Sequence, residues 1–135
     1  MDLEAVAGEL ADALGVIEGL SVPEWGVQRI HPPAALITLP DRIEYDDTYQ
    51  RGADRIPDWS VVVLMARPTD PGARRSIAAY AAGSGPKSVK AAIEAHTYTA
   101  CGEPRVTSAD FDVLTYAGTD YLAAVFHLDI TGEGA

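Results

Sequence analysis

Apolar positions near the amino terminus recur at intervals of three and four residues. The residues that carry this repeat are Leu3, Val6, Ala7, Leu10, Leu14 and Ile17. Such spacing places apolar side chains on one face of an amphipathic helix. Asp2 and Glu4 would lie in its first turn, where the helix dipole favours negative charge. We therefore predict an N-terminal helix over residues 1–18.

The middle of the chain changes to patterns typical of strands. Residues 35–39 form a short apolar run between two prolines and Pro40, and prolines are common where strands begin or end. Residues 58–66 are almost continuously apolar and rich in valine. A run of this length and composition indicates a central strand that is covered on both faces.

Helical signals follow the central strand. Asp70 and Pro71 are a residue pair expected at the N-cap and the first position of a helix, which would end at Gly83. A second short helix is expected over residues 87–96, where apolar residues again recur at helical spacing.

The last third of the chain predicts a strand hairpin. Residues 105–116 contain β-formers, and residues 121–130 alternate between strongly apolar and more polar positions. Gly118 lies between them in a turn, so we expect the two strands to pair antiparallel. Residues 131–135 are predicted to be a loose tail. Together the elements predict a single α+β domain over residues 1–135: a mostly antiparallel β-sheet with helices packed on one face.

Residues 41–58 are predicted to form an extended β-arm or hairpin. The segment is polar and contains too few apolar residues for the core. It combines tyrosine and arginine, which are enriched at binding hot spots, with acidic residues. A solvated loop would explain the same composition. If the arm does bind other subunits, the expected contact residues are Tyr45, Asp46, Asp47, Tyr49, Arg51, Asp54 and Arg55.

The charge balance narrows the possible functions. The chain has 20 acidic and 10 basic residues, for a net charge of −10. Nucleic-acid binding and binding to anionic lipids both depend on Lys and Arg, so neither is expected. No apolar run approaches the ~20 residues needed to cross a bilayer. The acidic amino terminus lacks the basic region of a signal peptide, so we expect a soluble protein that assembles in the cytoplasm.

No catalytic, metal or cofactor site is expected from the sequence. The loop at residues 83–88 differs from a phosphate-binding loop because Pro86 precedes the lysine and has no N–H to offer. His31, His96 and His127 lack the spacing of a zinc site. The single cysteine, Cys101, is expected to be a small semi-buried side chain.

Several stretches resemble, in the same order, the tail terminator proteins of siphophages that infect actinobacteria. They lie at residues 32–40, 45–55, 61–64, 80–94 and 116–126, within a match that extends from about Leu3 to Ile130. Each stretch is modest by itself, so the resemblance depends on their shared order.

The resemblance implies a structural virion protein without a catalytic site. Its copies would form a hexameric ring that caps the tail tube and joins it to the head-closure or connector protein. DNA would pass through the ring without specific binding, which suits an acidic subunit. Extended loops of the family reach neighbouring subunits, as residues 41–58 would. Two alternatives stay open: another neck component, such as a head-closure or connector protein, and a small soluble ligand-binding α+β domain with an apolar pocket.

Overall fold

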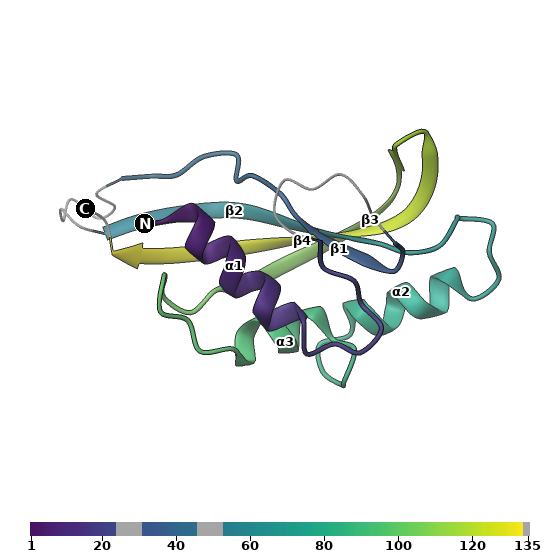
Figure 1. The fold of residues 1–135 in the computed structure, drawn as a ribbon, viewed down its shortest axis with the longest axis horizontal. Helices are drawn as coiled ribbons and strands as arrows, with labels where there is room; N and C mark the ends of the chain where they lie inside the picture. Colours follow the sequence, from purple (N-terminus) through teal and green to yellow (C-terminus); the bar gives the residue numbers. More distant parts are fainter. Residues whose placement is uncertain (24–30, 46–52, 134–135) are drawn as a thin grey trace.

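The computed structural model describes residues 1–23, 31–45 and 53–133 (Figure 1). None of the helices in these ranges is long and apolar enough to cross a membrane. The elements in chain order are α1 (Leu3–Leu14), β1 (Ala34–Ile37), β2 (Ala53–Leu64), α2 (Ala73–Ala81), α3 (Val89–Ala95), β3 (Arg105–Tyr116) and β4 (Thr119–Glu133).

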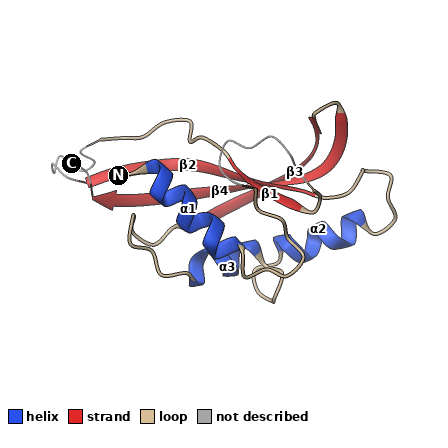
Figure 2. Ribbon diagram, in the orientation of Figure 1, coloured by secondary structure: helices blue, strands red, loops and turns tan. Residues whose placement is uncertain are grey.

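The described strands form one open antiparallel sheet in the order β1-β2-β4-β3. The three helices lie together on one side of it (Figure 2). This arrangement confirms the predicted α+β class with a mostly antiparallel sheet. The two long inner strands, β2 and β4, pair over most of their length, whereas β1 and β3 are the edge strands.

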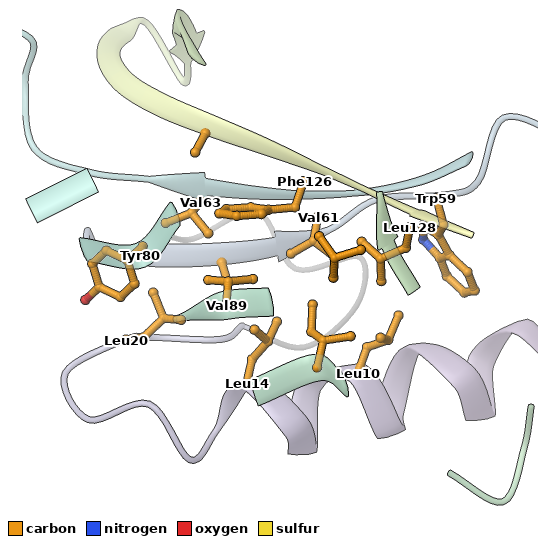
Figure 3. Packing of buried hydrophobic residues seen from close by; sticks show 14 of the residues in the cluster. Leu10, Leu14, Leu20, Trp59, Val61, Val63, Tyr80, Val89, Phe126 and Leu128 are labelled. Atoms are coloured by element: carbon orange, nitrogen blue, oxygen red, sulfur yellow. The ribbon is translucent and has the colours of Figure 1, made fainter. Parts of the chain in front are cut away.

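The core lies between the helices and one face of the sheet (Figure 3). Strand alternation turns Val61 and Val63 of β2, and Phe126 and Leu128 of β4, toward the helix layer, where all four are buried. The prediction that the central strand is covered on both faces was wrong for β2. Its residues alternate between buried and half-buried because the described helices cover only one face.

The start of β2 and the end of β4 differ from the predicted limits, because these two segments pair with each other. The first residues of β2 pair with the last residues of β4, from Ala53 opposite Glu133 to Ile56 opposite Ile130. Residues 53–58 therefore belong to the sheet and not to an extended arm, and residues 131–133 are strand instead of loose tail. Both segments look polar and irregular alone, and each becomes a strand because the other satisfies its backbone groups.

The helix limits also differ from the prediction. α1 begins after Asp2, whose carboxylate accepts hydrogen bonds from the N–H groups of Glu4 and Ala5, and it ends at Leu14 instead of residue 18. α2 begins at Ala73 with Gly72 as its N-cap, so the prediction that Asp70 caps this helix was wrong. The Asp70 carbonyl instead accepts from the Ala73 N–H in the preceding turn.

The predicted β3–β4 hairpin is present and has a two-residue turn. Tyr116 pairs with Thr119, and the turn residues Ala117 and Gly118 have φ angles of 52° and 80°. Two consecutive positive φ angles match the right-handed twist of paired strands, and glycine adopts such an angle without steric cost. Figure 1 shows the end of this hairpin rising at the right of the view, away from the helices.

Candidate interaction surface

The end of the β3–β4 hairpin exposes apolar side chains that face the helix side of the sheet. Phe111 is 57% exposed and Val113 is 47% exposed. They pair with Ala124 and Leu122 of β4, so they point to the same face as the buried core residues of that strand. The end of the hairpin curves away from the helices (Figure 1). Two large apolar side chains are therefore in contact with water.

The outer edge of β3 has backbone groups that do not belong to the β4 ladder. In a two-residue hairpin the residues flanking the turn, Tyr116 and Thr119, form a hydrogen-bonded pair, and such pairs alternate with pairs that point outward. Counting back from Tyr116 in continuous register makes Val113, Phe111 and Ala109 outward-pointing residues. The N–H of Val113 agrees with this count, because it donates to Oδ1 of Asp112 at 2.8 Å.

Acidic side chains cover part of this edge. Before the bulge at Thr107, the outward N–H of Val106 donates to Oε2 of Glu94 at 3.0 Å. Asp112 does the same for Val113. Between these two points, the described residues supply no acceptor for the N–H of Ala109 or Phe111.

The opposite edge of the sheet is covered by the chain itself. Ser21 donates to the carbonyl of Pro33 at 2.9 Å, and its own carbonyl accepts from Ala35 at 2.8 Å. Farther along, Thr38 donates through its N–H and its hydroxyl to the carbonyl of Ser60. Among the strands that the structure describes, β3 therefore has the accessible edge.

A histidine joins the three longest strands on the face away from the helices. Nδ1 of His127 in β4 lies 2.8 Å from the Asp58 carboxylate of β2, and Nε2 lies 2.8 Å from the Asp110 carboxylate of β3. The hydrogen bond with Asp58 raises the pKa of His127, partial burial lowers it, and Asp110 raises it further, so that the pKa lies above its ordinary value. Both ring nitrogens have carboxylate partners, which suits a cross-strand clamp better than an acid–base catalyst.

The hollow beside the hairpin turn does not gather reactive groups. It has a volume of about 570 Å³ and lies between the turn and the loop after β2. Its charged lining residues are Arg67 and Asp120. In the described ranges, no group of three His, Cys, Asp or Glu side chains is placed to hold a metal ion. Burial raises the pKa of the Cys101 thiol to about 11, with a further contribution from Glu9, so this thiol is neutral at pH 7.

The three predicted contact residues of the arm that the structure describes do not form one exposed surface. Tyr45 is 71% exposed. Asp54 is only 4% exposed, and its carboxylate lies 3.0 Å from the amino group of Met1. Arg55 donates to both carboxylate oxygens of Asp129, at 3.1 and 2.9 Å. The predicted exposure of Asp54 was wrong because this residue lies on the core face of β2. Asp46, Asp47, Tyr49 and Arg51 lie outside the described residues.

The base of the arm has the hairpin geometry that was one of the two predicted forms. Glu44 and Arg55 form an antiparallel bridge, with each N–H donating to the other carbonyl, at 2.7 and 2.8 Å. Arg55 thus has neighbours on both sides, Glu44 and Thr131. Its side chain and backbone are engaged within the chain.

Sequence reasoning did not identify the exposed hairpin end because it took Phe111 and Val113 only as β-forming residues of a strand. Element length was the available signal. A strand of 12 residues such as β3 extends about 40 Å, whereas a helix of nine residues such as α2 extends about 14 Å. Short helices cannot cover the whole face of such a hairpin.

Neither a protein-family model nor a curated protein matches this chain.

Proposed function

We propose that this chain is a structural subunit of a bacteriophage tail: the terminator that assembles into a ring, caps the tail tube and joins it to the head connector. The observation that supports an assembly role is the hairpin end, where Phe111 and Val113 expose apolar surface beyond the helix layer. The order of the sequence stretches that resemble tail terminators supports the specific role.

An assembly role explains exposed apolar surface better than a monomeric role does. A large apolar side chain beside a free strand edge is a hazard for a protein that stays monomeric, because it favours uncontrolled association. In an assembly the same groups become buried at an interface. The net charge of −10 fits a ring through which DNA passes, since phosphates are repelled and not retained.

The test begins with the purified protein. Native mass spectrometry and electron microscopy should show closed rings of several copies. The double variant F111S/V113S should reduce docking to the tail tube or connector, or ring formation, because it removes the apolar contact. The control is V16S, which changes a side chain that is 73% exposed in the turn after α1, outside the hairpin. This control should assemble as the unchanged protein does.

Removal of the gene from a phage that encodes this chain separates the possible assembly roles. A terminator is required to stop tube growth, so its loss should produce tails of uncontrolled length or tails that fail to join heads. Normal virions without the protein would reject the proposal. Rings that bind isolated heads but not tail tubes would replace the terminator role with that of a head-closure or connector protein.

A further inference from the structure

We infer that the free edge of β3 accepts an extended segment of a different protein as a fifth strand, and that this segment carries basic residues on one face and apolar residues on the other. The inference goes beyond the proposed function and does not depend on ring formation. It rests on the backbone, the apolar side chains and the charges of one stretch, Ala109–Val113.

The backbone of this stretch has the arrangement needed to add a strand. Ala109, Phe111 and Val113 point their N–H and carbonyl groups away from β4. Hydrogen bonds from an added strand would satisfy the groups that have no partner in the described residues. Glu94 and Asp112 occupy the N–H groups on either side of Ala109 and Phe111, so the open stretch is short.

The two faces of the stretch differ in chemistry. Phe111 and Val113 lie on the helix side and are exposed. Asp110 and Asp112 lie on the other face, and the Asp110 side chain is 74% exposed. Residues directly opposite each other on paired strands attract when their charges are opposite and repel when they are alike. A matching strand therefore offers apolar residues to Phe111 and Val113, and Lys or Arg to the two carboxylates.

The same charges disfavour β3 of a second copy as the added strand. An antiparallel β3–β3 pair centred on Phe111 places Asp110 opposite Asp112 of the second copy, and the reverse. Centring the pair on Asp110 or on Asp112 places that residue opposite itself. Each of these three registers therefore sets carboxylate against carboxylate. β1 is no better as a donor, because Ser21 and the residues that follow the strand already cover its edge.

The first experiment uses two blocked ten-residue peptides as probes, one alternating valine and lysine and the other alternating valine and glutamate. Each is titrated into the ¹⁵N-labelled protein. The valine–lysine peptide should shift the amide signals of residues 107–113 and slow hydrogen exchange at Ala109 and Phe111. The valine–glutamate peptide should have an affinity at least about tenfold lower, because two attractive charge pairs become repulsive.

Variants then separate strand addition from general attraction. F111P removes an outward N–H without removing a β4 ladder bond, and F111A removes only the side chain. F111P should weaken binding of the valine–lysine peptide by a further factor of about ten relative to F111A, because it also blocks the backbone.

Charge reversal provides a second criterion that holds even if F111P fails to fold. D112K should weaken binding of the valine–lysine peptide and strengthen binding of the valine–glutamate peptide. The inference is wrong if neither peptide shifts the β3 amides at millimolar concentration, or if the shifts map to the helices. It is also wrong if D112K leaves the preference for lysine unchanged. None of these readouts depends on ring assembly, so the proposed function can fail while this inference stands, and the reverse.

Discussion

The two edges of the sheet both have outward-pointing backbone groups, but they differ in whether another segment of the described chain bonds to those groups. At the β1 edge, the outward N–H of Ala35 donates to the carbonyl of Ser21 at 2.8 Å, and the strand is only four residues long. At the β3 edge, the outward N–H of Phe111 has no acceptor in the described residues, and the strand has 12 residues. The chain closes one edge with its own backbone and leaves the longer one accessible.

This difference shows where stability and binding are located. Near the β1 edge, Trp59 is fully buried and its indole Nε1 donates to the carbonyl of Thr38, so an aromatic side chain holds the covering segment against the sheet. Near the β3 edge, the aromatic side chain of Phe111 touches water. Burial makes the first a source of folding free energy, whereas exposure makes the second a contact for another molecule.

The largest expected effect contrasts the two aromatic residues. W59A should lower the free energy of unfolding by about 3–5 kcal/mol, because it leaves a cavity and removes the indole donor. F111A should change it by less than about 0.5 kcal/mol, as expected for an exposed side chain. Urea unfolding followed by circular dichroism measures both. Similar losses from the two variants would mean that the hairpin end is packed in solution.

A smaller effect on stability is expected from replacing the residues that carry the two outward N–H groups with proline. A35P should cost about 3 kcal/mol, because it removes the hydrogen bond to Ser21 in a buried position. F111P should cost less than about 1 kcal/mol, because proline is tolerated where an edge N–H has no partner. The two melting temperatures, measured under one set of conditions, test this. If F111P is destabilised as strongly as A35P, the assigned hydrogen-bond alternation of β3 is wrong.

The smallest effect concerns the clamp that holds β3 to the sheet. The pKa of His127 is raised in the folded state, mainly by its hydrogen bond with Asp58. The stabilisation is therefore fully present below the unfolded pKa of roughly 6.5 and is lost as pH rises through the folded value. It should amount to about 1 kcal/mol or less, because the group is partly solvated.

The pH effect is measured by comparing unfolding of the unchanged protein and H127Q at pH 5.5 and pH 8.5. The difference between the two proteins should be larger at the lower pH. D58N should lower the pKa of His127, measured by NMR titration, more than D110N does, since Asp58 is the stronger influence. A larger stabilisation by His127 at pH 8.5 than at pH 5.5 would contradict the assignment.

Local patterns predicted much of the fold. The repeat around Leu10 predicted the first helix, and the alternation around Phe126 predicted the last strand and its inward face. Gly118 predicted the turn of the hairpin. These features depend on neighbours in the chain, whose periodicity can be read directly. The limits of β2 and β4 could not be read in this way, because each end is a strand only through pairing with the other.

The candidate surface was harder to predict than the fold. Tyr45 was expected to be exposed and is exposed, whereas Asp54 was expected on an arm and is buried in β2. Phe111 was placed in a strand with no prediction about its burial, and it is exposed. At Asp54 and Phe111 the local pattern was compatible with both environments, and segments distant in the sequence decided between them.

By itself, the sequence determined where the main helices and strands lie along the chain, and the alternation of apolar residues gave the inward face of the last strand, because the backbone repeats of 3.6 and two residues impose those directions. Only the tertiary structure decided which faces are covered and which edges are closed. Covering depends on whether the helices and the sheet stay against each other, and closing depends on whether another segment reaches the edge. Phe111 points toward the helix side of the sheet like Phe126, yet it is exposed because the hairpin end curves away from the helices (Figure 1).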